Sequence, residues 1–167
     1  MGKKNQKQYE DFPLSLALFD ALPVIFFCCA MLVISVKYKN KIFLTGAVVC
    51  TAAGIGKVLW KIIIAASKKD ITWLNKQLRF VMPAGFLLVL IGMVMGIANG
   101  SIQGQVLRSA VCSMPAGGFF TVTVIAMIMM SVFAVKLDGT KLRSNWIEQI
   151  TNAIGQLCFL VGVILIM

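Results

Sequence analysis

Residues 52–64 read Ala-Ala-Gly-Ile-Gly-Lys-Val-Leu-Trp-Lys-Ile-Ile-Ile, which places Lys57 and Lys61 inside an otherwise apolar run. The run extends over residues 42–66, long enough for a membrane-spanning helix. A lysine near the centre of a bilayer costs about 2.5 to 3.5 kcal/mol on insertion scales. The two lysines share one helix face because they are four residues apart. They therefore need counter-charges on neighbouring helices or a route to water.

The composition places the chain in lipid. Hydrophobic residues make up 59% of the 167 residues, charged residues only 13%, and the mean hydropathy is +0.90. Soluble domains carry about 25% charged residues. We predict an all-α polytopic integral membrane protein, a compact bundle of about five transmembrane helices that forms one domain over residues 1–167. The predicted helices cover residues 14–36, 42–66, 80–98, 111–135 and 146–167.

The net charge of +10 comes from 16 Lys and Arg against 6 Asp and Glu, and most of the cations lie in short connections beside apolar runs. This distribution is typical of topology determinants and of contact with anionic lipid, so we expect no nucleic-acid binding. Placing the N-terminus in the cytoplasm puts ten of these cations inside and four outside, as the positive-inside rule favours. The inside set is Lys3, Lys4, Lys7, Lys68, Lys69, Lys76, Arg79, Lys136, Lys141 and Arg143, and the outside set is Lys37, Lys39, Lys41 and Arg108. We predict a prokaryotic plasma (inner) membrane protein with a cytoplasmic N-terminus and an external C-terminus.

The chain contains no histidine. This removes the usual haem ligand, most catalytic zinc sites and the Ser-His and Cys-His nucleophile pairs. The five cysteines lie within or beside apolar runs and form no Cys-x-x-Cys pair, which indicates buried free thiols. Because no catalytic motif is present either, we expect no enzyme activity, no cofactor and no bound metal.

Asp20 is the nearest candidate counter-charge for the two lysines. It lies 18 residues before Tyr38, at the turn between the first two spans, while Lys57 and Lys61 lie 19 and 23 residues after Tyr38. At ~1.5 Å per residue, antiparallel helices bring these side chains to similar depth. We predict that Asp20 pairs with Lys57, the deeper lysine. The alternative is that Asp20 caps a helix beginning at Ala21, while Lys61 extends to the interface as a snorkelling side chain.

Three polar residues lie on one stripe of the fifth span, because Glu148, Asn152 and Gln156 are spaced at i, i+4 and i+8. Such a stripe should face protein or a water-filled cavity, since unpaired polar groups in hydrocarbon cost several kcal/mol. Two alternatives remain: Glu148 as the partner of an Asn145 N-cap, and the two amides as hydrogen-bonding contacts between helices. Under the predicted topology the candidate polar site lies in the cytoplasmic half and comprises Asp20, Lys57, Lys61, Glu148, Asn152 and Gln156.

Two further features concern helix packing. Gly92 and Gly96 form a small-x-x-x-small pair in the third span, which predicts the close approach of another helix on that face. Met-Pro-Ala-Gly occurs at residues 82–85 and again at residues 114–117, near the predicted starts of successive spans. This similarity is compatible with an inverted repeat of the transporter kind, or with the ordinary use of proline in the first turn of a helix.

Intramembrane ionisable residues mark a functional site by default, so we expect a transporter or channel-like protein. Two lysines favour a small anionic or carboxylate-bearing solute, and the carboxylates of Asp20 and Glu148 are available for proton coupling. Five short helices enclose little interior, so a homo-oligomer or a partner membrane protein is expected. The alternative function is a noncatalytic accessory or assembly subunit of a membrane complex, in which the polar residues hold helices together.

Overall fold

The computed structural model describes residues 13–67, 72–137 and 141–167, and it confirms the all-α prediction for them. The helices are α2 (Leu14–Phe19), α3 (Ala21–Tyr38), α4 (Lys41–Ser67), α5 (Thr72–Ala98), α6 (Gly104–Cys112), α7 (Ala116–Lys136) and α8 (Leu142–Ile166). Five segments of the described chain are long and apolar enough to cross a membrane: Leu14–Tyr38, Lys41–Ile63, Phe80–Ala98, Ala116–Phe133 and Leu142–Ile166. The first of these combines α2 and α3. The chain is therefore a multi-pass membrane protein.

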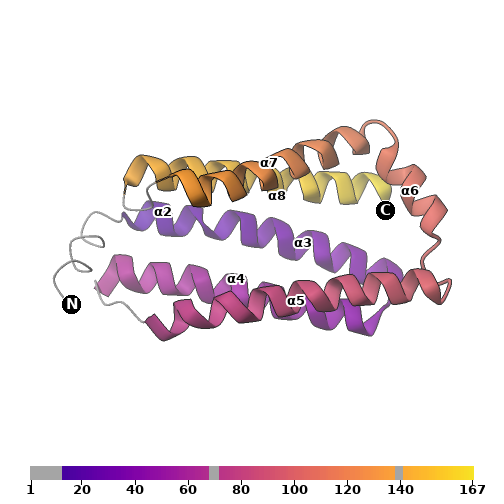
Figure 1. The fold of residues 1–167 in the computed structure, drawn as a ribbon, viewed down its shortest axis with the longest axis horizontal. Helices are drawn as coiled ribbons and strands as arrows, with labels where there is room; N and C mark the ends of the chain where they lie inside the picture. Colours follow the sequence, from indigo (N-terminus) through magenta and orange to yellow (C-terminus); the bar gives the residue numbers. More distant parts are fainter. Residues whose placement is uncertain (1–12, 68–71, 138–140) are drawn as a thin grey trace.

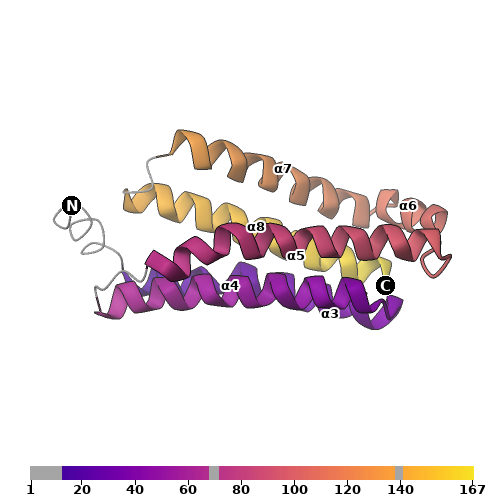
Figure 2. The same ribbon diagram turned by 60° about the horizontal axis from the view of Figure 1, so that its bottom comes forward.

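The spanning helices pack as a curled row in the order α5, α4, α3, α8, α7 (Figures 1 and 2). Two helical hairpins, α4 with α5 and α7 with α8, have the most extensive contacts, and α3 lies between them. α5 packs mainly on α4, whereas α7 packs mainly on α8. The row therefore has two open edges, one at α5 and one at α7.

The fourth span differs from its predicted bounds of 111–135. The chain first forms the separate helix α6, and α7 begins only at Ala116. Pro115 is the N-cap residue of α7, and a proline disfavours helical backbone in the residue before it, which accounts for the interruption after Cys112. α6 has opposed polar and apolar faces and crosses the end of the bundle, which suits a position at the membrane interface (Figure 1).

The two Met-Pro-Ala-Gly segments occupy different structural positions. Pro115 lies at the start of α7, whereas Pro83 lies inside α5, which begins at Thr72. The third helix is thus longer at its N-terminal side than the predicted span of 80–98, and its proline is not in a first turn. The sequence similarity therefore does not correspond to equivalent positions in two helices.

Glycines allow α4 and α5 to approach each other closely. A Cβ atom built on Gly46 would lie 2.6 Å from the backbone nitrogen of Val89, and one on Gly92 would lie 2.5 Å from the backbone nitrogen of Phe43. A Cβ on Gly96 would instead meet Ile102 at 2.6 Å, and Ile102 belongs to the turn that follows α5. Gly92 thus faces a neighbouring helix, while Gly96 packs mainly against the connection after its own helix.

Asn40 joins the start of α4 to α5. Its Oδ1 accepts hydrogen bonds from the backbone N–H groups of Ile42 (3.0 Å) and Phe43 (3.1 Å), as an N-cap residue does. Its Nδ2 donates to the carbonyl oxygen of Gly92 at 2.7 Å. One side chain therefore caps the helix and fixes the α4–α5 register at the Gly92 contact.

Candidate functional site

Asp20 lies at the break between α2 and α3. It has helical backbone angles (φ −63°, ψ −15°), and its side chain makes no capping hydrogen bond at the start of α3. Instead its Oδ2 lies 2.8 Å from Nζ of Lys61 on α4, in an ion pair whose side chains are only 4% (Asp20) and 12% (Lys61) exposed. α3 does begin at Ala21 with Asp20 at its N-cap position, as the capping alternative states, but the carboxylate pairs with Lys61 instead of capping the helix. The snorkelling alternative is wrong, because the Lys61 side chain is almost buried and meets Asp20 inside the bundle.

The prediction that Asp20 pairs with Lys57 is also wrong. Lys57 is exposed and takes part in no ion pair with another described residue. Helical side chains lean towards the N-terminus of their helix. In the antiparallel helices α3 and α4, this brings Asp20 and Lys61 towards each other and turns Lys57 away from Asp20. Lys57 has its Cα at the depth of the Asp20 Cα. Asp20 nevertheless pairs with Lys61, one helical turn further along α4.

Glu148, Asn152 and Gln156 extend along α8, which packs against α3. All three side chains are partly buried, and Glu148 lies close enough to Lys61 to attract its charge. α8 begins at Leu142 with Lys141 as its N-cap residue, so Asn145 lies inside the helix. The capping-box explanation of Glu148 is therefore wrong.

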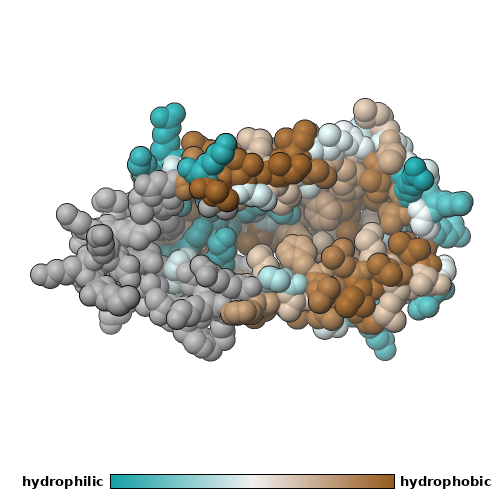
Figure 3. Space-filling view, viewed as in Figure 1, coloured by the Kyte–Doolittle hydropathy of each residue, from teal (hydrophilic) through white to brown (hydrophobic). Residues whose placement is uncertain are grey.

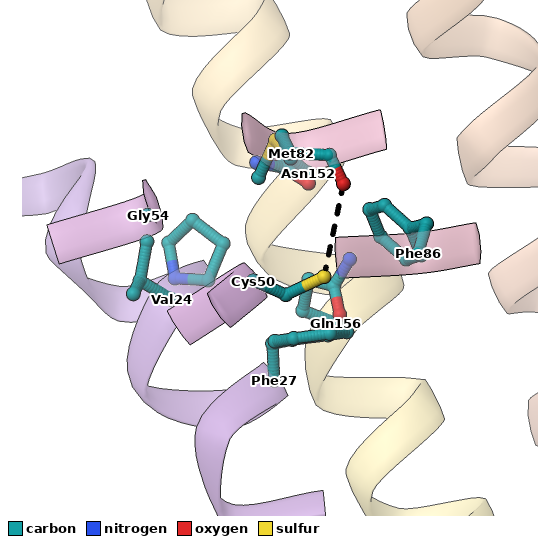
Figure 4. Close-up of a pocket in the computed structure, with 9 residues that line it drawn as sticks. Val24, Phe27, Cys50, Gly54, Met82, Phe86, Asn152 and Gln156 are labelled. Carbon is teal, nitrogen blue, oxygen red and sulfur yellow. Dashed lines mark hydrogen bonds between the residues drawn. The ribbon is translucent and has the colours of Figure 1, made fainter. Parts of the chain in front are cut away.

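A cavity of about 90 Å³ lies between α3, α4, α5 and α8 (Figure 4). Its lining is Pro23, Val24, Phe27, Cys50, Gly54, Met82, Phe86, Asn152 and Gln156. Cys50 and Gly54 lie near the middle of the 27-residue helix α4, so the cavity lies close to the centre of the bundle. Many transporters bind their solutes near the bilayer midplane, between helices.

A residue that lines the cavity carries a buried polar atom without a hydrogen bond. Oε1 of Gln156 is buried and has no hydrogen-bond partner among the described residues. The Cys50 thiol lies 3.9 Å from the carbonyl oxygen of Met82, the contact drawn in Figure 4, and is a weak donor at that distance. In Figure 4 the Gln156 side chain is drawn by Cys50 and Phe86, and Asn152 is drawn by Met82. The α8 wall therefore supplies the amide groups of a mainly apolar cavity.

The ion pair and the cavity are consecutive along the helices. Asp20 precedes the cavity-lining Pro23 by three residues, about one turn. On α4, Lys57 follows the cavity-lining Gly54 by three residues, and Lys61, the partner of Asp20, follows it by seven, about two turns. A stripe of polar residues runs along α8 and comprises Glu148, Asn152 and Gln156. Figure 3 shows hydrophilic atoms in the recess between the α7–α8 half and the α4–α5 half, towards the end where α2 begins. We use the name polar path for the cavity together with six residues: Asp20, Lys57, Lys61, Glu148, Asn152 and Gln156.

An apolar cluster lies beyond the cavity, towards the α6 end of the bundle. Met31, Phe43, Ala47 and Val89 form its buried centre, and Phe27, Ile34 and Phe159 pack against them. Polar groups therefore reach the cavity from the end of the bundle where α2 begins, while this cluster fills the space towards the other end. The site has one polar side and one apolar side.

Two polar residues escaped the sequence reasoning. Asn40 carried a usable signal, because an asparagine directly before an apolar run is a preferred N-cap. Gln149 is only 5% exposed, and its Oε1 lacks a hydrogen-bond partner among the described residues. Gln149 does not line the cavity. It lies on a different face of α8 from Glu148, so the i, i+4 spacing of the polar residues does not predict its burial.

The polar path offers charges and amides. Within the described residues, no three His, Cys, Asp or Glu side chains come together as metal ligands do. The arrangement offers a cation at Lys57, amide groups on α8 and apolar contact surface at Phe27 and Phe86. No protein-family model, curated protein or solved structure that was compared with the chain matches it.

Proposed function

We propose that this protein is a small transporter or channel-like protein that binds an anionic or carboxylate-bearing solute in the polar path. The observation that carries the proposal is the buried Asp20–Lys61 ion pair beside a cavity near the middle of the bundle, with Asp20 about one turn and Lys61 about two turns from residues that line the cavity. Ionisable residues inside a membrane are expensive and usually face a solute pathway or a proton relay. An ion pair needed only for packing would not require a cavity and an amide stripe beside it.

The charge arrangement favours an anion. Asp20 engages Lys61 directly, while Lys57 stands exposed one turn nearer the cavity lining. Lys57 is therefore the cation that the solute would meet, and Lys61 adds a second positive charge close by. Glu148, whose charge acts on Lys61, adds a second carboxylate to the path.

We propose a plasma membrane location in a prokaryote, with the polar path open to the cytoplasm. Leu14 and Ile166 lie at opposite ends of the bundle (Figure 1), and the positive-inside rule assigns the Leu14 end to the cytoplasm. A reporter that is active only outside the cytoplasm should work when fused after Met167. Activity of a cytoplasm-only reporter at the same position would reverse the assignment.

A thermal-shift screen of the detergent-purified protein against small metabolite anions tests the proposal. A solute that binds only the folded protein raises its melting temperature by mass action, with a gain of about 2.7 kcal/mol at a hundred times the dissociation constant. Lys57→Met should raise at least tenfold the solute concentration that is needed for the same shift in melting temperature. Lys41→Met is the matched control, because Lys41 is exposed at the opposite end of α4. If no anion shifts the melting temperature, or if both variants respond equally, the proposed site is wrong.

The second candidate function is a noncatalytic accessory subunit, which the open edges of the helix row favour. Only 11% of the α7 span and 22% of the α5 span are buried within the chain. A partner membrane protein or a second copy of this chain would cover those faces and close the polar path laterally. Stoichiometric copurification with another membrane protein, together with no response to any anion, would favour this function.

A further inference from the structure

We infer that a groove between α3 and α4 is the binding site of one anionic phospholipid, whose acyl chain lies in the groove and whose phosphate group meets Lys39 and Lys41. The groove shares no residue with the polar path or with the lining of its cavity. The lipid site is therefore separate from the proposed solute site and does not depend on the proposed function.

The groove is apolar and lies on the surface of the α3–α4 pair. The buried Met31 and Ala47 form its floor, while Leu32 of α3 and Leu44 of α4, each about half exposed, stand beside them. No charged residue of the described chain lines it. The Ser35 hydroxyl in the lining already donates to the carbonyl oxygen of Met31 at 2.7 Å, so it needs no hydrogen bond from an occupant. The lining thus suits a hydrocarbon chain.

The length of the groove matches one leaflet of a bilayer. Leu44 and Ile55 line its two ends on α4 and are 11 residues apart, which is ~16 Å along the helix axis. The hydrocarbon core of a bilayer is about 30 Å thick, so one leaflet contributes ~15 Å. A membrane-spanning helix of another protein would contact α3 and α4 across both leaflets. An acyl chain ends near the midplane, as the groove does.

Two lysines lie at the outer end of the groove. Lys41 shares one face of α4 with the lining residues Leu44 and Val48, at i, i+3 and i+7. The backbone N–H of Lys39 donates to the carbonyl oxygen of Ser35 at 3.0 Å, so Lys39 lies one turn beyond that lining residue. Both lysines are exposed, and neither forms an ion pair with another described residue. Their charges are therefore available to a phosphate group.

The position of the lysines along the membrane normal suits a lipid head group. One candidate span ends at Tyr38 and the next begins at Lys41, which places the turn between them at the membrane surface. The acidic side chains that the structure describes, Asp20 and Glu148, both lie towards the opposite end of the bundle. Under the proposed topology the turn is external, where the positive-inside rule does not favour cations, so an anionic lipid gives these lysines a role. Each juxtamembrane lysine raises the affinity for anionic lipid about fivefold.

Native mass spectrometry of the intact protein in detergent tests the inference. The protein is titrated with phosphatidylglycerol or with phosphatidylcholine that has the same acyl chains. We expect one phosphatidylglycerol to bind about 25-fold more tightly, because two lysines contribute about fivefold each. Glycerol 3-phosphate, a head group without acyl chains, should not bind at the same concentrations. Equal affinities for the two lipids, or binding of glycerol 3-phosphate as tight as that of phosphatidylglycerol, would overturn the inference.

Two double variants separate this site from the general positive charge of the surface. Lys39→Gln with Lys41→Gln should reduce the preference for phosphatidylglycerol to less than about threefold. Lys37→Gln with Arg108→Gln is the matched control and should keep at least about a tenfold preference. It removes the same charge at the same end of the bundle, but Lys37 donates to the carbonyl oxygen of Ile166 on α8, and Arg108 lies on α6. Equal losses in the two double variants would show a diffuse charge effect and would overturn the inference.

A bulky residue in the groove tests the acyl-chain contact. Ala52 is exposed and lines the groove, so Ala52→Trp should weaken phosphatidylglycerol binding at least tenfold. Ala84→Trp is the matched control and should leave binding unchanged, because Ala84 is exposed on α5 and does not line the groove.

Unchanged lipid binding in Ala52→Trp would overturn the inference. An oligomer that binds no phospholipid and dissociates in Ala52→Trp would show that a protein helix occupies the groove, and would also overturn it. The comparison between the two lipids uses the unaltered protein, so it remains decisive if a variant does not fold.

Discussion

Breaking the Asp20–Lys61 ion pair should destabilise the bundle more than any surface change, and replacing both residues should recover much of the loss. Both side chains are almost buried, at 4% and 12% exposure, and their charged atoms are 2.8 Å apart. Removing one partner of a buried pair costs about 3 to 5 kcal/mol, because the remaining charge is left uncompensated. Lys61 lies six residues from the end of α4, ~9 Å along the axis, so partial access to water places the expected loss near ~3 kcal/mol.

The assay is a double-mutant cycle on the free energy of unfolding, measured by denaturant titration in detergent micelles. Asp20→Asn and Lys61→Met should each cost about 3 kcal/mol, and the double variant should cost at least ~2 kcal/mol less than the two losses added together. The matched cycle combines Asp20→Asn with Lys57→Met, and its coupling should stay near ~0.5 kcal/mol because Lys57 is exposed and unpaired with Asp20. Additive losses for Asp20 and Lys61, or a stronger coupling to Lys57, would refute the reasoning.

Two further predictions concern the α4–α5 hairpin and use the same unfolding assay. Gly92→Leu should cost about 3 kcal/mol or more, because a Cβ there would lie 2.5 Å from the Phe43 backbone nitrogen; Gly118→Leu, where the nearest atom is 3.9 Å away, should cost less than ~1 kcal/mol. Equal effects of the two leucines would show that α4 and α5 do not meet at Gly92. Asn40→Ala removes a helix cap and the hydrogen bond to the Gly92 carbonyl, and should cost about 2 kcal/mol. A loss below ~0.5 kcal/mol would mean that neither interaction contributes in the folded protein.

The hydrophobic pattern predicts the membrane helices because the bilayer imposes one length and one polarity on every span. It predicts the helix that contains the second span to within one residue at each end, 42–66 against Lys41–Ser67 for α4. It fails at residues 111–115, which it assigns to the fourth span, because Val111 and Cys112 end the separate helix α6 and residues 113–115 connect α6 to α7. Hydropathy alone does not distinguish an apolar residue at the interface from one in the bilayer core.

Residue spacing from the turn at Tyr38 predicts correctly that Asp20 forms an ion pair with a lysine of α4, but it predicts Lys57 instead of Lys61. Counting residues from the turn matches Cα heights, but the charged atoms of Asp20 and Lys61 lie several bonds from their Cα atoms and lean in opposite directions. The cavity is harder still to predict, because it depends on how Phe27, Phe86 and Cys50 from three helices fail to fill one space. Single-helix patterns contain no information on such a mismatch.

Site-directed thiol labelling tests most directly whether the polar path is open to water from the cytoplasm. In a variant whose native cysteines are replaced by serine, Asn152→Cys places a thiol on the cavity wall, while Ile154→Cys places one on the half-exposed apolar face of the same helix. A membrane-impermeant thiol reagent should label the residue 152 variant in inside-out vesicles and not in right-side-out vesicles, and should leave the residue 154 variant unlabelled in both. If the thiol at position 152 stays unlabelled from both sides, or reacts only from the outside, there is no cytoplasm-facing polar path in this protein.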